Sequence, residues 1–233
     1  FRNVYFRYDK TAAESILNDI SFTVEPEEKV ALVGASGCGK STVISLLARF
    51  YDIDSGKIIF GSRDLYDYSL ESIYRQMGIV FQETILFSGT IEENVRYAKL
   101  DATSQELEAA AEAANALGFI QSFPNGWNTV IGERGIGLSG GQRQALTLLM
   151  ATMVPPQLLL LDEHTAALDP GTADKVLKLT QKIIRRNHTT CLMVTHNMHQ
   201  ALELGNRTLM MDDGKIVLDV QGEEREHMTV SDL

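Results

Sequence analysis

The 233-residue sequence lacks several features that mark particular classes of protein. Its two cysteines, Cys38 and Cys191, are too far apart for a Cys-x-x-Cys pair, so we expect free thiols in a reducing compartment. No secretory signal is visible. The longest uncharged stretch, residues 144–161, is interrupted by Pro155 and Pro156, and its pieces are too short to span a bilayer. We therefore expect a soluble chain, for which a partner would provide any membrane spans.

The sequence also has no excess of basic residues. It has 21 Lys and Arg residues against 31 Asp and Glu residues, which gives a net charge of -10. A nucleic-acid backbone attracts the opposite sign, so the composition argues against a general nucleic-acid binder. With 44% hydrophobic residues, the chain is long enough to bury one substantial core, as one domain or a domain with a lobe.

Short apolar and alternating segments predict strands interspersed with helices. The expected strands are residues 2–8, 20–24, 29–33, 57–60, 78–81, 158–161, 190–194, 207–212 and 215–220. The expected helices are residues 40–50, 103–117, 142–152, 171–186 and 198–204, the second opened by a capping box of Thr103 and Glu106. Asp213-Gly214 predicts a hairpin turn. This order predicts an α/β fold with a three-layer core, a mostly parallel sheet and an antiparallel flank. Residues 1–84 and 155–233 would form the core, and residues 85–154 a helical subdomain.

A glycine-rich stretch, Gly34 to Ser41, lies between an expected strand and an expected helix. That context is typical of the phosphate-binding loop of P-loop nucleoside triphosphatases, in which glycines let backbone N–H groups converge on phosphate oxygens at a helix N-terminus. Lys40 would neutralise the β- and γ-phosphates, and Ser41 would bind Mg²⁺. The predicted nucleotide-binding residues here are Gly34, Ser36, Gly37, Cys38, Gly39, Lys40, Ser41 and Thr42. A chance glycine turn is the alternative, and Cys38 is either a passive residue or a redox-sensitive thiol.

Two acids, Asp162 and Glu163, end the apolar run of residues 158–161. Such a run predicts a buried parallel strand, and ligands bind at the carboxyl ends of such strands. Asp162 would hold Mg²⁺, and Glu163 would polarise the attacking water as general base. An acidic pair after a strand is by itself most often a solvated turn, so its functional interpretation depends on the phosphate loop.

Residues 138–142 read Leu-Ser-Gly-Gly-Gln, well downstream of the phosphate loop. Chance seldom places both patterns in one chain. Together they resemble the nucleotide-binding domain of ABC (ATP-binding cassette) transporters. The resemblance implies that Ser139, Gly140 and Gly141, at the start of the helix from Gln142, cap the γ-phosphate bound to Lys40 of a second subunit. Two ATP molecules would join a head-to-tail homodimer or paired cassette, and hydrolysis would move attached transmembrane domains.

The resemblance also gives roles to residues that are unremarkable by themselves. It identifies His196 as the switch histidine at the γ-phosphate, Gln82 as the glutamine that senses Mg²⁺ and couples to membrane helices, and Asp169 as part of the D-loop at the dimer interface. Tyr8 falls where the family stacks an aromatic ring on adenine, and a core tyrosine is the alternative. The remaining histidines match no such position and are expected to be ordinary structural residues: His164, His188, His199 and His227.

The resemblance is uneven along the chain. Residues 1–137 resemble exporter cassettes, for example at residues 85–94 and 132–135. Exporters then usually read RQRIAIARAL and EATSALD, where this chain has RQALTLLM from residue 143 and EHTAALD from residue 163. Residues 138–233 resemble importer-type or stand-alone cassettes, which leads us to hypothesise a chimera joined near residues 138–142.

Three functions follow from these observations. The first is a transport ATPase domain that uses ATP and Mg²⁺ at the cytoplasmic face of a membrane. The second is a chimeric scaffold that binds nucleotide but is poorly active. The third is an ABC ATPase of DNA repair or translation, which lacks support because the sequence has no coiled-coil insertion, tandem cassette or basic patch.

Overall fold

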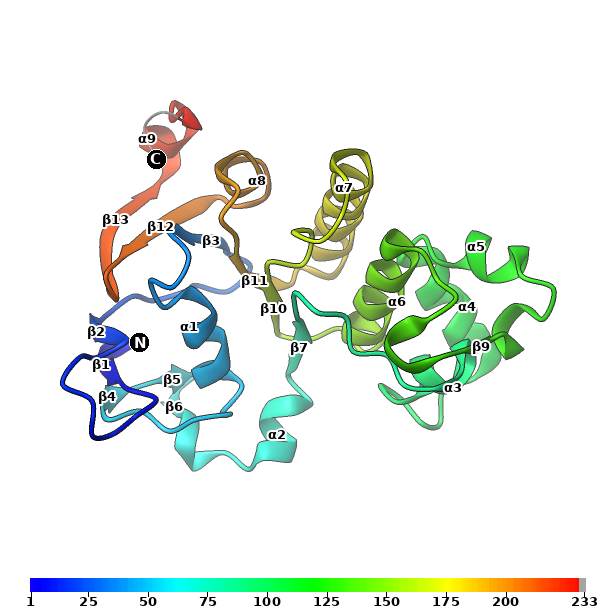
Figure 1. Ribbon diagram of the computed structural model, residues 1–233, viewed down its shortest axis with the longest axis horizontal. Helices are drawn as coiled ribbons and strands as arrows, with labels where there is room; N and C mark the ends of the chain where they lie inside the picture. Colours follow the sequence, from blue (N-terminus) through cyan, green and yellow to red (C-terminus); the bar gives the residue numbers. More distant parts are fainter. Residues whose placement is uncertain (231–233) are drawn as a thin grey trace. The chain divides into compact units, whose positions relative to one another are not determined.

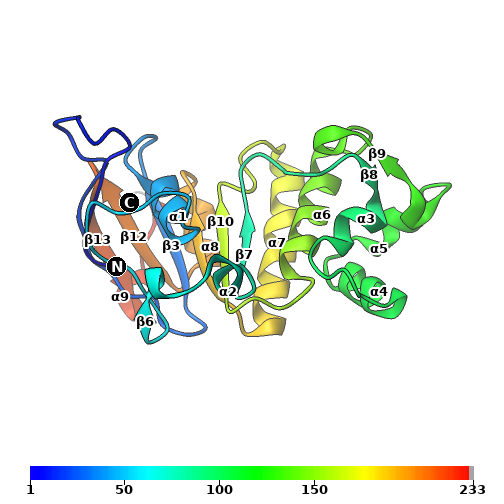
Figure 2. The same cartoon turned by 90° about the horizontal axis from the view of Figure 1, so that it is seen from below.

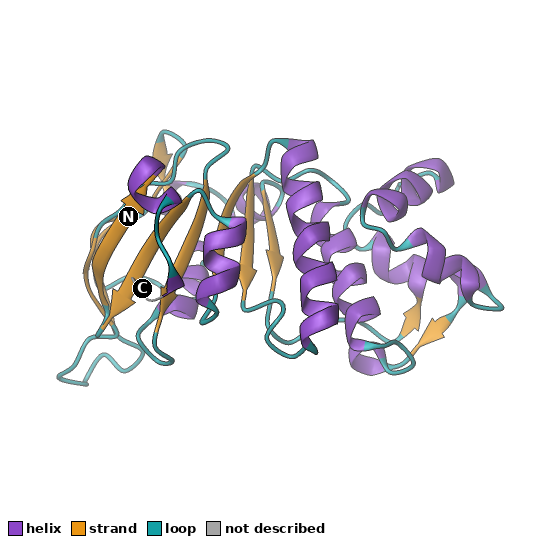
Figure 3. Cartoon of the chain, turned by 90° about the horizontal axis from the view of Figure 1, so that it is seen from above, coloured by secondary structure: helices purple, strands orange, loops and turns teal. Residues whose placement is uncertain are grey.

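The computed structural model describes residues 1–230 (Figure 1). The chain divides into two compact units, one formed by Phe1–Met77 with the segment from Thr190 onward, the other by Gly78–Thr189. The predicted helical subdomain, residues 85–154, falls inside the second unit. Residues 231–233, the end of the predicted core, lie outside the described residues. Coloured by secondary structure, Figure 3 shows that strands are concentrated in the first unit and helices in the second.

The first unit contains a mainly parallel sheet in the order β13-β12-β3-β11. Strands β11 (Thr190–Val194) and β12 (Arg207–Asp212) pair parallel with β3 (Lys29–Gly34), whereas β13 (Lys215–Gln221) pairs antiparallel with β12. Residues 30–33 of β3 are fully buried, as expected for a strand covered on both faces. Asp213 and Gly214 both have positive φ, 44° and 70°, so the predicted hairpin turn is confirmed. The helices of this sheet are α1 (Lys40–Leu47), α8 (Met198–Leu204) and α9 (Gly222–Glu226).

An antiparallel flank completes the first unit. Its order is β2-β1-β4, with β1 (Arg2–Phe6), β2 (Leu17–Ile20) and β4 (Ser55–Lys57). The position predicted for the second strand, residues 20–24, was wrong, because β1 pairs with residues 17 to 20 instead. The predicted strand 57–60 is two strands: β4 pairs with β1, and β5 (Ile59–Phe60) pairs with β6 (Arg63–Asp64) on the other side of the fully buried Ile58. Helix α2 (Leu70–Tyr74) follows.

The second unit is mainly helical. Its helices are α3 (Ile91–Arg96), α4 (Ser104–Ala113), α5 (Leu117–Ser122), α6 (Gly140–Thr152) and α7 (Pro170–Asn187). Neighbouring strands β7 (Met77–Val80) and β10 (Leu158–Asp162) and the small hairpin of β8 (Gly89–Thr90) and β9 (Val130–Ile131) accompany them. Helix α6 contacts α7 on one side and α3 and α4 on the other (Figure 2).

Capping and backbone conformation explain where helix α4 begins and ends. The capping box of Thr103 and Glu106 opens α4 as predicted. The helix ends at Ala113 rather than near residue 117, because Asn115 adopts a left-handed backbone with φ of 50°. Among residues 1–230, no helix combines the length and apolar character that crossing a bilayer requires.

Candidate functional site

The glycine-rich loop leaves β3 at Gly34 and enters α1 at Lys40. Gly34 has φ of 145°, and a Cβ atom on it would lie 2.1 Å from the carbonyl oxygen of Met211 on the adjacent strand β12. Gly37 has φ of 84°, although a Cβ atom there would meet no neighbour within 4 Å. Glycine is therefore required at Gly34 by both space and backbone conformation, and at Gly37 by conformation alone.

Lys40 is buried within this loop, with 4% of its surface exposed. Its Nζ atom donates to the carbonyl oxygens of Gly34 at 2.9 Å and Ala35 at 2.7 Å, and it lies 3.8 Å from Sγ of Cys38. The loop carbonyls thus hold a positive charge beside the N-terminus of α1, which is a favourable place for a phosphate. Cys38 is 8% exposed, which favours its interpretation as a passive loop residue.

Tyr8 lies beside the first turn of α1. Its hydroxyl shares a hydrogen bond of 3.1 Å with Oγ1 of Thr42, and its ring makes edge contacts with the rings of Phe6 and Tyr51 at centroid distances of 4.8 and 4.9 Å. Half of Tyr8 is exposed. The hydroxyl and the ring contacts fix the side chain while leaving part of the ring accessible, so the position differs from that of a core tyrosine.

His196 follows β11 and is exposed. The backbone N–H of Thr195 donates to the carbonyl oxygen of Leu32, two residues before β3 ends at Gly34. Because β3 and β11 are parallel, the loop and His196 leave the sheet at the same edge. Within the first unit, the structure therefore brings Tyr8, the loop around Lys40 and the segment of His196 to one side of the sheet.

The second unit carries the predicted acids and Gln82. Asp162 ends β10, and the half-buried Glu163 follows it with φ of 45°. Gln82 is exposed just beyond β7, the strand next to β10. Asp162 and Gln82 each offer an oxygen, as does the hydroxyl of Ser41 in the first unit, and oxygen is the donor that Mg²⁺ prefers. The donor types thus fit magnesium.

The pentapeptide at residues 138–142 opens α6. Ser139 is the N-cap: its Oγ accepts from the backbone N–H of Gln142 at 3.2 Å, and its own N–H donates to Oε1 of Gln142 at 2.8 Å. This reciprocal capping box was missed in the sequence, although Ser followed three residues later by Gln is its ordinary signature.

The glycines of the pentapeptide also allow α6 to approach α7. A Cβ atom on Gly140 would lie 3.0 Å from Leu168, and one on Gly141 would lie 2.7 Å from Thr172. Asp169 caps α7 by accepting from the backbone N–H of Thr172, and hydrogen bonds from Thr172 lower the pKa of the Asp169 carboxyl. The second unit therefore places Ser139, the two glycines and Asp169 around two adjoining helix N-termini.

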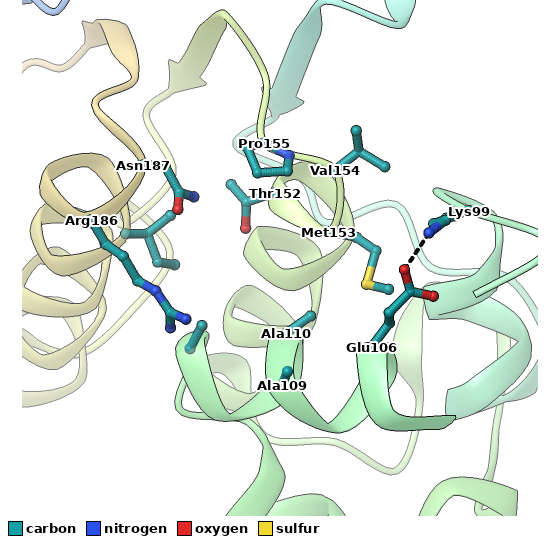
Figure 4. A pocket seen from close by; sticks show the side chains of 12 residues that line it. Lys99, Glu106, Ala109, Ala110, Thr152, Met153, Val154, Pro155, Arg186 and Asn187 are labelled. Carbon is teal, nitrogen blue, oxygen red and sulfur yellow. Dashed lines mark hydrogen bonds and ion pairs between the residues drawn. The ribbon is translucent and has the colours of Figure 1, made fainter. Parts of the chain in front are cut away.

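A cavity of about 410 Å³ in the second unit lies elsewhere (Figure 4). Its walls come from α4, from the end of α6 and the residues after it, and from the end of α7, with the ion pair of Lys99 and Glu106 on one side. None of the predicted site residues lines it. A phosphate loop presents backbone N–H groups at the surface, so the predicted nucleotide site does not need this cavity.

Comparisons of the chain with known proteins agree on one family. Residues 17–166 match the family model described as ABC transporter. Over 217 residues the chain is 43% identical to the putative multidrug export ATP-binding/permease protein YgaD of Bacillus subtilis, covering 93% of this chain and 37% of that protein. It is 39% identical over 216 residues to the mitochondrial iron-sulfur clusters transporter atm1 of Aspergillus fumigatus, covering 93% of this chain and 29% of the transporter.

A solved structure agrees. A bacterial Atm1-family ABC exporter with ATP bound superposes with a TM-score of 0.86 at 35% identity, covering 95% of this chain and 38% of that one. The chain thus spans between 29% and 38% of the length of these proteins.

The chimera hypothesis is not supported by these comparisons. Single natural proteins, YgaD and atm1, each match 93% of the chain, so the similarity continues through residues 138–142 and beyond. The importer-type interpretation of residues 138–233 falls with it. Two of the local departures lie in buried positions: Ala145 of α6, where the usual exporter pattern has arginine, and His164. The capping box of Ser139 and Gln142 also lies across the supposed junction without disruption.

Proposed function

Because the chain belongs to the ABC transporter family and is an ATP-binding domain of the exporter type, we propose that it hydrolyses MgATP to drive attached transmembrane domains. The observation that carries this proposal is the phosphate loop. Lys40 is almost fully buried and is held by the loop's own carbonyl oxygens, and Gly34 permits the close approach of β12. Such a loop binds the β- and γ-phosphates of a nucleotide.

Residues of the first unit bind the nucleotide. The backbone N–H groups of residues 34–42 surround the phosphates, with Lys40 as the neutralising charge. Tyr8 stacks on the base, a contact that tolerates different bases and is worth about 1–3 kcal/mol. His196 donates a hydrogen bond to the γ-phosphate. The support for these roles is that Tyr8 is tied to Thr42 and that β3 and β11 end at one edge.

Residues of the second unit, with Ser41 of the first, serve the chemistry. Asp162, Gln82 and Ser41 would hold Mg²⁺, and the bound ion would neutralise charge on the phosphates. Glu163 orients the attacking water and accepts its proton as general base. The half-buried environment of Glu163 and its fixed backbone support this role, since a base must be held within hydrogen-bond reach of its water.

The pentapeptide acts on a second copy of the chain. Ser139 and the N–H groups of Gly140 and Gly141 cap the γ-phosphate held by Lys40 of that copy, at the N-terminus of α6. Asp169 lies at the same dimer interface. Two bound ATP molecules then join a two-fold homodimer, which opens after hydrolysis and moves transmembrane domains at the cytoplasmic face of a membrane. The exposure of Ser139 and its place at a helix N-terminus support this arrangement.

Nucleotide binding and phosphate release test the proposal together. The wild-type chain is expected to bind a fluorescent ATP analogue and to release phosphate with Mg²⁺. Lys40→Ala should weaken binding, whereas Lys57→Ala, an exposed lysine on β4, should not. Glu163→Gln should bind ATP normally and release almost no phosphate, with the exposed Glu224→Gln as its control. Unchanged affinity in Lys40→Ala, or normal turnover in Glu163→Gln, would refute the corresponding role.

A further inference from the structure

His164 directly follows the proposed base Glu163 and is buried, with 3% of its surface exposed. The exporter pattern EATSALD has alanine at this position, so the imidazole is a feature of this chain. A buried polar ring needs a hydrogen-bond partner, because leaving its N–H group unpaired away from water is unfavourable. The partner that His164 finds lies on another element of the same unit.

That partner is Thr180, a fully buried residue of α7. Nε2 of His164 lies 3.2 Å from Oγ1 of Thr180. The Thr180 hydroxyl donates its proton to the carbonyl oxygen of Val176 at 2.9 Å, so toward His164 it offers a lone pair. Nε2 of His164 therefore carries the proton and donates it to Thr180. The chain of two bonds fixes both the tautomer and the orientation of the ring.

Glu163 is the residue in this segment whose backbone conformation must be stabilised by its surroundings. Its φ of 45° lies in the left-handed region, which is unfavourable for a residue with a side chain. Such a conformation persists only where the surroundings over-determine it, and it is often found at functional sites. On one side, the carbonyl oxygen of Glu163 accepts from the N–H of Ala166 at 2.9 Å. On the other, the ring of the next residue is tied to Thr180.

Helix α7 holds Thr180 in a fixed position. It runs from Pro170 to Asn187, begins with the cap of Asp169, and packs against α6 where Gly141 meets Thr172. Thr180 lies in the middle of this helix, away from its fraying ends. A bond to Thr180 therefore connects the backbone beside Glu163 to the same helix that carries the D-loop residue at its start.

We propose that His164 is a positioning residue, which through its hydrogen bond to Thr180 holds the Glu163 carboxylate in the orientation that activates water. This inference rests on the proposed ATP hydrolysis. His164 itself does not touch the nucleotide. Without this bond the Glu163 side chain is still present, but its backbone can leave the left-handed conformation. The rate of hydrolysis then falls, while nucleotide binding by the phosphate loop persists.

The experiment measures kcat and KM for ATP in three variants, each normalised to folded protein. His164→Ala removes the ring, and Thr180→Val removes the acceptor while keeping the shape of the side chain. Each should lower kcat at least 10-fold and change KM for ATP less than 2-fold, on the order of magnitude expected when a base is misplaced. His164→Gln, whose Nε2 can donate to Thr180, should restore most of kcat.

A double variant and a core control separate positioning from stability. His164→Ala with Thr180→Val should be no slower than either single variant, because both remove the same bond. Ile183→Ala removes a buried side chain from the same helix and should destabilise the fold without lowering kcat. A wild-type kcat in Thr180→Val, or an equal loss in Ile183→Ala, overturns the inference while the proposed function stands. A wild-type chain that binds ATP and never hydrolyses it overturns both.

Discussion

Two glycines of the phosphate loop offer a matched comparison, Gly34→Ala against Gly37→Ala. Both residues have positive φ, 145° and 84°, and both lie in the same loop. They differ in space: a Cβ atom on Gly34 would lie 2.1 Å from the carbonyl oxygen of Met211, whereas one on Gly37 meets nothing within 4 Å. No side chain can absorb the first contact, because the atom it meets is backbone in the neighbouring strand.

The magnitudes follow from these two terms. The sparsely populated backbone conformation costs about 1–3 kcal/mol in either variant. Displacing β12 from β3 adds about 1–3 kcal/mol in Gly34→Ala alone. We therefore expect the free energy of unfolding to fall by about 1–3 kcal/mol in Gly37→Ala and by about 2–6 kcal/mol in Gly34→Ala.

Urea unfolding followed by far-ultraviolet circular dichroism measures both values, with the slope against urea checked for equality among the variants. Wild type serves as the reference, and Gly118→Ala, an open glycine without positive φ, serves as the control. If Gly34→Ala and Gly37→Ala lowered the free energy of unfolding equally, the reasoning would be refuted, because the close approach of β12 to Gly34 would then contribute nothing to the loss of stability.

Three further outcomes are expected. Ser139→Ala removes the N-cap of α6 and should lower the free energy of unfolding by about 1 kcal/mol; an unchanged urea midpoint would contradict the capping geometry. Burial lowers the pKa of His164 to about 4, so the folded chain resists a proton that the unfolded chain accepts. As pH falls from 7 to 4, the free energy of unfolding of the wild type should therefore fall by about 3 kcal/mol more than that of His164→Ala. If the free energies of unfolding of the two proteins changed equally with pH, the ring could not be neutral and buried. Burial also raises the pKa of the Cys191 thiol to about 12, so iodoacetamide at pH 8 should alkylate Cys191 only in urea, as mass spectrometry can check; rapid labelling of the native chain would argue against its burial.

The elements with strong local signals could be predicted from the sequence. Strands β3, β10 and β11 are short apolar runs. Such a run predicts a strand buried on both faces even when the strands that pair with it are unknown. The hairpin of β12 and β13 depends on Asp213-Gly214, whose backbone requirement is local. Helix α4 follows from its capping box. In each case the energy that decides the structure comes from residues close together in the chain.

The features that were missed depend on distant residues. Strand β2 was misplaced because alternation alone does not reveal which residues pair with β1. The two-residue strands β8 and β9 exist only as each other's partner. Of the site, the phosphate loop, the acids after β10 and the pentapeptide carry recognisable patterns. The packing of Gly141 against Thr172 and the bond from His164 to Thr180 have no sequence pattern, because each joins α7 to a segment elsewhere in the chain.

Light scattering on Glu163→Gln, with and without MgATP, tests most directly the claim that two copies build one composite site. The substitution keeps the shape of the side chain and removes the base, so bound ATP should persist. We expect a shift from 25.8 kDa to twice that mass on adding MgATP, and no shift when Ser139→Arg is added to the same chain. A mass that stays at 25.8 kDa while ATP binding is confirmed would contradict it.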